Sequence, residues 1–149
     1  SEQFMRVIDD KINTLGIREK VEILDMVPQT ELVRLYHVAD ICFFPSYQEM
    51  GFSRTPLEAM ACGCVLVTYG NEGSDEILQQ NENGYLIDYE NIGQTGKIIK
   101  ELLDLPDSFR SIVKRARKEI EDNYSINKYI DKVESMIINF HKTDLVNFL

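Results

Sequence analysis

The sequence predicts an α/β fold in which a parallel sheet is flanked by helices, and three observations support this. Short apolar runs alternate with helical patterns at intervals of about twenty residues, as in βαβ units. The apolar runs are rich in β-branched residues, which is typical of buried parallel strands. Glycine, proline and helix-capping residues separate the runs from the helical patterns. We therefore expect consecutive strands to lie parallel in one sheet.

Apolar runs at residues 21–24, 41–44, 64–69 and 85–88 are the expected strands. The run at 64–69 is the longest, which favours an interior position in the sheet. Pro45 ends the ladder of the second strand because proline has no N–H to donate. The Asn83-Gly84 pair is a turn signal before the last strand.

Helical periodicity covers most of the remaining sequence. Gly16 and Gly63 are expected to stop the helices that precede them. Thr55, Pro56 and Glu58 have the spacing of a capping box, with Thr55 as the N-cap. Five of the expected helices begin at a capping residue: Thr30, Thr55, Ser74, Asp107 or Ser125. The expected helices cover residues 2–15, 30–37, 55–62, a short stretch from 74, 92–104, 108–123 and 126–141.

Composition and charge exclude several classes of function. With 149 residues, 44% of them hydrophobic, the chain is one domain or part of one. A net charge of −9 argues against a nucleic-acid groove or a membrane contact, and the basic cluster at 114–118 is followed at once by acids that would pair with it. No apolar run approaches the roughly 18 residues of a membrane span and no signal peptide is evident, so a cytoplasmic protein is expected.

The three cysteines fit reduced core residues better than disulfides. Cys42, Cys62 and Cys64 are odd in number and lie in apolar surroundings. Cys62 and Cys64 resemble half of a metal site, but His37 and His141 are isolated, so no second pair completes it. No metal or other cofactor is expected.

The segment from Pro45 to Gly63 carries the strongest functional signal. It joins the carboxyl end of an expected parallel strand to the start of a helix. At such a junction, unpaired amides and the positive end of the helix dipole favour an anionic ligand.

Residues 49–63 resemble the signature of the group 1 retaining glycosyltransferases, which use nucleotide-sugar donors on a two-domain GT-B fold. Segments 36–46, 70–76 and 82–88 resemble the same family in the same order, and the match runs from about residue 14 to 125. The resemblance implies a Rossmann-like sheet from the C-terminal half of a GT-B fold. Residues 1–125 would be a partial nucleotide-sugar donor-binding domain, and 126–149 a C-terminal helix.

Two glutamates carry the central roles that the resemblance implies. Glu58 would bind the donor ribose, because a carboxylate accepts hydrogen bonds from two neighbouring hydroxyls, although a capping box alone also explains it. The family's first glutamate, which contacts the donor sugar, should lie at the position of Met50. A one-residue bulge in the loop would bring Glu49 into that catalytic position. The alternative is that Glu49 is a solvated acid of the loop without such a role.

The other residues implied in donor binding flank the same loop or follow the first strand. Gly51 also fits an ordinary turn glycine, and Arg54 also fits a solvated side chain. Met26 and Val27 also fit a plain core. The resemblance places Gly51, Phe52 and Ser53 at the sugar and diphosphate, Arg54 and Thr55 near the phosphates, and Met26 and Val27 beside the nucleobase.

Parts of the family's donor domain would precede Ser1. They are two strands, together with an arginine and a lysine that grip the diphosphate, and the acceptor-binding domain is also lacking. The chain is therefore expected to be an N-terminally truncated piece of a larger enzyme and to be inactive by itself. The missing strands would be central, so the chain is expected to self-associate through open strand edges or to rearrange its sheet.

The resemblance implies that the parent enzyme transfers a sugar from a nucleoside diphosphate sugar to an acceptor, with retention and without a metal, in polysaccharide biosynthesis. Arg54 and the missing cations would stabilise the leaving diphosphate. The alternative is a non-catalytic nucleotide-sugar-binding or assembly module of the same fold, which Met50 and the missing cations motivate. A nucleotide-sugar epimerase of this fold is a third hypothesis, for which no acid/base residues are identified.

Overall fold

The computed structural model describes residues 2–46, 53–70, 73–89 and 91–147 and divides the chain into two compact units, Ser1–Leu32 and Val33–Leu149.

The first unit contains helix α1 (Glu2–Thr14) and the short 3-10 helix η1 (Arg18–Lys20). Gly16 follows α1 with φ of 64°, a left-handed conformation that suits glycine, so the expected helix and its stop are confirmed. Ile12 is the buried residue of α1. An ion pair of 3.0 Å between Arg18 Nη1 and Asp9 Oδ1 ties η1 to the helix.

The strand expected at residues 21–24 is not formed, so that prediction is wrong. These residues have no regular structure, and Ile23 and Leu24 are 37% and 47% exposed. A strand requires a neighbour for its backbone N–H and C=O groups. Among the described residues no strand pairs with this segment.

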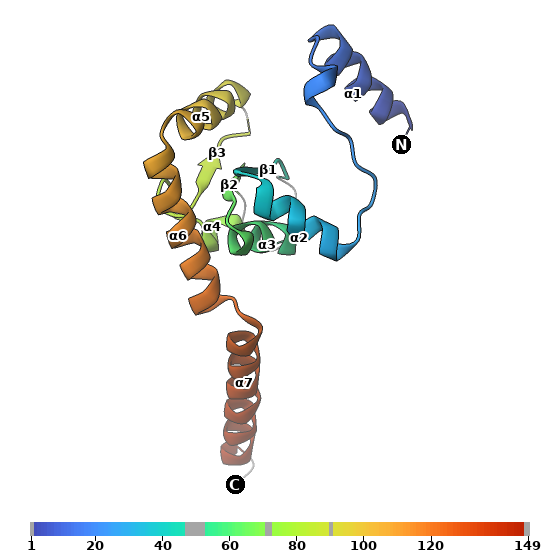
Figure 1. Cartoon of the computed structure of the whole chain (residues 1–149). Helices are drawn as coiled ribbons and strands as arrows, with labels where there is room; N and C mark the ends of the chain where they lie inside the picture. Colours follow the sequence, from blue (N-terminus) through green and yellow to red (C-terminus); the bar gives the residue numbers. More distant parts are fainter. Residues whose placement is uncertain (1, 47–52, 71–72, 90, 148–149) are drawn as a thin grey trace. The chain divides into compact units, whose positions relative to one another are not determined.

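The second unit is built on a parallel sheet of strands β1 (Ile41–Phe44), β2 (Val65–Tyr69) and β3 (Tyr85–Ile87). Their order is β1-β2-β3, so β2 lies in the middle (Figure 1). Ile41 pairs with Val65 and Val67 with Tyr85. Every residue of β2 is buried, which confirms the interior position that its sequence predicts.

Helices cover both faces of this sheet. On one face Val65, Val67 and Tyr69 pack with residues of α5 (Ile92–Asp104) and α6 (Pro106–Asn123). On the other face Leu66 packs with residues of α3 (Arg54–Cys62), α4 (Ser74–Ile77) and α6. The alternation of side chains along β2 therefore serves two apolar clusters, and α6 contributes to both.

The expected helices are present, although several begin at other residues than predicted. Helix α2 (Gln29–Val38) begins before Thr30, so Thr30 is not its N-cap. Instead, the backbone carbonyl of Pro28 accepts hydrogen bonds from the amides of Glu31 and Leu32. The N-cap of α4 is Gly73, and the hydroxyl of Ser74 donates to the carbonyl of Tyr69 at 2.9 Å.

The helices of the C-terminal part follow the predicted pattern closely. Helix α5 matches the prediction, and the side chain of Asn91 caps it by accepting from the amide of Gln94. Helix α6 begins at Pro106 rather than after Asp107, because proline suits the first helical position. Helix α7 (Ile126–Asn147) starts after Ser125 as expected and runs beyond residue 141. None of the helices in the described ranges combines the length and the apolar character needed to cross a bilayer.

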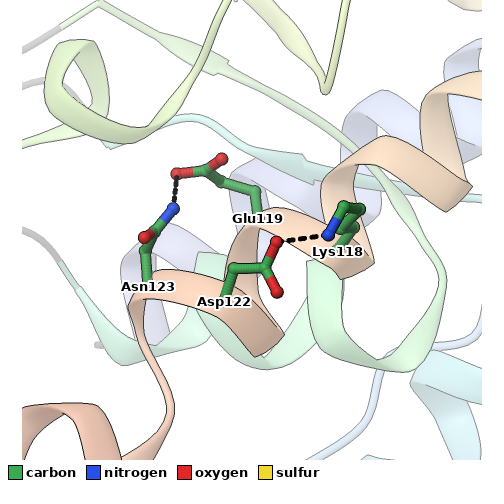
Figure 2. A network of polar contacts seen from close by, with 4 residues as sticks. All are labelled: Lys118, Glu119, Asp122 and Asn123. Carbon is green, nitrogen blue, oxygen red and sulfur yellow. Dashed lines mark hydrogen bonds and ion pairs between the residues drawn. The ribbon is translucent and has the colours of Figure 1, made fainter.

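Two residues of the basic cluster on α6 pair with acids that follow it, as its sequence predicts. Arg117 Nε lies 2.9 Å from Glu121 Oε1, and Lys118 forms an ion pair with Asp122. Figure 2 shows the pair of Lys118 and Asp122. Beside it, the amide of Asn123 donates to Glu119 at 2.8 Å (Figure 2). These exposed groups neutralise one another, so the cluster does not resemble an anion site.

The turn before β3 is held by buried polar contacts. The amide group of Asn83 donates to the carbonyl of Ile77 at 2.9 Å, and its oxygen accepts from the amide of Gln79 at 2.7 Å. A Cβ at Gly84 would lie 2.6 Å from Leu78 Cδ2 and 3.0 Å from the backbone oxygen of Leu66. Glycine is therefore required where the turn approaches β2.

We predict that Gly84→Ala lowers the free energy of unfolding by about 1–3 kcal/mol, because the added methyl group overpacks against Leu78 and Leu66. Urea denaturation would measure the change. Gly96→Ala is the matched control: its Cβ would meet no atom within 4 Å, and alanine favours the interior of α5 by about 0.5–1 kcal/mol. Equal stability of Gly84→Ala and the unmodified chain would contradict the prediction.

Candidate functional site

The candidate site lies where β1 ends and α3 begins, at the carboxyl edge of the parallel sheet. The hydroxyl of Thr68 on β2 donates to the carbonyl of Phe44 at 2.7 Å and so fixes the end of β1. Pro45 and Ser46 follow, and the description resumes at Ser53. Ligands of open α/β sheets bind at this edge.

Helix α3 starts earlier than its sequence predicts, so the expected capping box is wrong. Its N-cap is Ser53, with φ of −67° and ψ of 146°, and no side chain caps it. Thr55 is the second helical residue and Pro56 the third. The first helical amides have no acceptor within the helix, so proline is tolerated at the third position as well as the first. Glu58 therefore falls in the second turn, too far along to cap the helix start.

Glu58 is left with no structural partner in the described part of the chain. Its side chain is half-buried, and neither a hydrogen bond nor an ion pair of its carboxylate is found there. Arg54 at the start of the same helix is exposed, while Ser53 and Thr55 are half-buried. The start of the helix thus brings its first amides, a cation and a carboxylate within about two turns.

The position of α3 is set by its buried face and its end. Ala59 and Met60 are fully buried. Gly63 ends the helix with φ of 100°, and the amide of Cys64 donates to the carbonyl of Ala59 at 3.0 Å. The stop predicted at Gly63 is confirmed.

The remaining predicted site residues lie outside the described residues or in the first unit. Glu49, Gly51 and Phe52 lie outside the described residues. Met26 and Val27 belong to the first unit. Met26 is 99% exposed, which contradicts the core interpretation of this side chain, and Val27 is half-buried.

Cys64 and Tyr36, for which the sequence predicts no role in the site, are both buried. The thiol of Cys64 is fully buried and donates to the carbonyls of Tyr36, at 3.1 Å, and Ala39, at 3.5 Å. Burial, followed by the charges of Cys42, Cys62 and Asp40, raises the pKa of Cys64 to about 11. Tyr36 is 8% exposed, and burial raises its pKa too.

Burial also raises the pKa values of the other two thiols, Cys42 and Cys62. The three cysteines are free, as predicted. Within the described ranges no group of three His, Cys, Asp or Glu side chains is arranged to hold a metal ion.

We predict that the free energy of unfolding falls as the pH rises from about 9 to about 11. The folded chain keeps the Cys64 proton up to a pKa of about 11, whereas the unfolded chain loses it near 9.0. Stability from this group is complete below pH 9, and roughly 2 kcal/mol of it is lost above. Urea denaturation near pH 8 and near pH 10.5 would measure the fall.

Cys64→Ala should show a smaller fall than the unmodified chain, and Cys62→Ala, which changes a half-buried thiol, is the matched control. The prediction fails if Cys64→Ala and the unmodified chain lose the same stability over this range.

Two comparisons relate the chain to solved structures. The C-terminal domain of a glycosyl transferase group 1 family protein, LpcC from Francisella tularensis, superposes with a TM-score of 0.76 at 24% identity, over 83% of this chain and 64% of that one. HepE of Anabaena, solved in complex with UDP-glucose, superposes with a TM-score of 0.84 at 18% identity, over 93% of this chain and 38% of that one. At these identities the likeness shows the fold, which is that of the C-terminal domain of GT-B proteins.

Sequence comparison identifies the family. Spore coat protein SA of Bacillus subtilis is 29% identical over 128 residues, which are 84% of this chain and 34% of that protein. The chain thus spans about a third of the length of this relative. The family model described as glycosyl transferases group 1 matches residues 5–119. The chain therefore belongs to the group 1 glycosyl transferase family.

Proposed function

We propose that this chain is the donor-binding part of a longer enzyme that transfers a sugar from a nucleoside diphosphate sugar to an acceptor. The observation that carries the proposal is the carboxylate of Glu58 on α3, which has no hydrogen bond or ion pair in the described part of the chain and lies one turn beyond the exposed Arg54. The family match and the fold shared with HepE, which was solved with UDP-glucose, support it.

Each group of the site has a chemical task in this proposal. The carboxylate of Glu58 accepts hydrogen bonds from the two hydroxyls of the donor ribose. The first amides of α3 and the guanidinium of Arg54 stabilise the negative charge that develops on the leaving diphosphate, with Ser53 and Thr55 close to the phosphates. Gly51 and Phe52 offer backbone amides to the sugar, and Glu49 contacts its hydroxyls. Met26 and Val27 flank the nucleobase.

Retention and metal independence extend the same proposal. Both rest on the family resemblance of residues 49–63. The anomeric configuration of the product, determined by NMR, tests retention, and the transfer rate in the presence of EDTA tests metal independence. Polysaccharide biosynthesis is the proposed setting, and the acceptor is to be sought among cell-envelope glycans.

A non-catalytic nucleotide-sugar-binding or assembly module is the alternative. The observation that favours it is Met50, which occupies the position of the family's first glutamate. Calorimetric titration of the full-length protein with UDP, GDP and their sugars separates the two functions. Tight binding without transfer to any acceptor would support the module.

We predict that Glu58→Ala in the full-length enzyme raises KM for the nucleotide-sugar donor about ten- to a hundredfold, because hydrogen bonds to a charged group are lost. Steady-state kinetics with UDP-glucose and with GDP-glucose would measure it. The control is Glu101→Ala on α5. After burial, the charge of Glu101 raises the pKa of Tyr85 at the start of β3, which is on the opposite edge of the sheet. Unchanged kinetics of Glu58→Ala would remove this residue from the site.

We also propose that the 149-residue chain, expressed by itself, self-associates. In the described part of the chain β1 pairs with β2 on one side and with no strand on the other, and Phe43 is 42% exposed. Open strand edges invite pairing with another chain. Sedimentation velocity should show species larger than the monomer at micromolar concentration, and a monodisperse monomer would contradict the proposal.

A further inference from the structure

Two buried hydroxyl groups hold the ends of two strands at the carboxyl edge of the sheet. The hydroxyl of Thr68, a residue that is 1% exposed, donates to the backbone carbonyl of Phe44 at 2.7 Å. The hydroxyl of Ser74, which is 2% exposed, donates to the carbonyl of Tyr69 at 2.9 Å. Phe44 is the last residue of β1 and Tyr69 the last of β2. Each of these strands is therefore held by a side-chain hydrogen bond where the chain leaves the sheet.

The bond of Thr68 is the one that joins two strands. A hydroxyl has one proton to donate, and the carbonyl of Tyr69, at 3.5 Å from the Thr68 oxygen, lies at the limit of a hydrogen bond. The proton is therefore donated to Phe44. Packing alone does not require a hydroxyl here, because Val65, Leu66 and Val67 of the same strand are apolar and fully buried. A buried hydroxyl costs free energy unless it has such a partner.

Phe44 connects this bond to α3. The side chain of Phe44 packs against the apolar cluster that contains the fully buried Met60 of α3, and Leu57 of α3 packs against the same cluster. Leu57 lies between Arg54 and Glu58 in the sequence of the helix. Phe44 is thus held to β2 through its carbonyl and to the core that supports α3 through its side chain.

We infer that Thr68 is a positioning residue for donor binding, because its hydroxyl fixes the carboxyl end of β1 against β2 and thereby the position of Arg54 and Glu58 on α3. The inference rests on the proposed function. Thr68 does not touch the donor in this role and acts through Phe44. Arg54 and Glu58 bind the diphosphate and the ribose of one donor at the same time, so a small shift of the helix weakens both contacts.

A bond that only stabilises the fold is the alternative. Its loss would then lower the melting temperature and leave the nucleotide affinity of the folded protein unchanged. A positioning bond instead changes the affinity of a protein that is still fully folded. The two roles therefore differ in a dissociation constant that is measured well below the melting temperature.

The test is Thr68→Val in the full-length protein, which removes the hydroxyl and keeps a β-branched side chain of the same shape. Titration calorimetry with UDP and with GDP measures Kd, and thermal unfolding of each variant sets the temperature of the titration. The Kd of the nucleotide that the unmodified protein binds should rise about three- to tenfold, the equivalent of one hydrogen bond. Thr68→Ser keeps the hydroxyl and should stay within about twofold of the unmodified protein, although loss of a buried methyl group lowers its melting temperature.

Thr95→Val is the matched control. Thr95 lies on α5 and is 6% exposed, and its hydroxyl has no hydrogen-bond partner in the described part of the chain. Removal of this hydroxyl should leave Kd unchanged. An unchanged Kd in Thr68→Val, or an equal rise in Thr68→Ser or Thr95→Val, would overturn the inference.

Glu58→Ala separates this inference from the proposed function. A higher Kd in Glu58→Ala together with an unchanged Kd in Thr68→Val would overturn the role of Thr68 alone. If Glu58→Ala leaves Kd unchanged, or if the unmodified protein binds neither nucleotide, the proposed function fails and the role of Thr68 fails with it.

Discussion

The burial of β2 is the constraint on which the second unit depends. Val65, Leu66 and Val67 are fully buried, and strands pair with β2 on both sides. Because successive residues point to opposite faces, one strand anchors both apolar clusters and fixes helices α3, α4, α5 and α6 around it. The turn at Gly84 approaches this strand so closely that a Cβ would lie 3.0 Å from the backbone oxygen of Leu66, which explains why the turn has no side chain there.

The geometry of the candidate site is a consequence of that anchoring. Parallel strands joined by helices place the start of each helix at the carboxyl edge of the sheet. Helix α3 is held there by the buried Ala59 and Met60, and Gly63 turns the chain back into β2. Glu58 therefore stays on a rigid element, and in the described part of the chain its carboxylate has no hydrogen bond or ion pair.

The two units illustrate how strand formation depends on partners. In the second unit, three apolar runs pair with one another and form the sheet. In the first unit, the run at 21–24 has similar local character and no described neighbour, and it forms no strand. The local sequence favours an extended conformation in both units, and pairing with a neighbouring strand decides whether a β-strand forms.

The sequence by itself determined the α/β class, the helices, three strands including the central one, the stop at Gly63 and the pairing of the basic cluster on α6. These follow from periodicity, turn residues and short-range charge, all of which act within a few residues. Tertiary structure decided the start of α3: proline is tolerated throughout the first turn, so the local sequence does not fix the first residue, and the N-cap is Ser53.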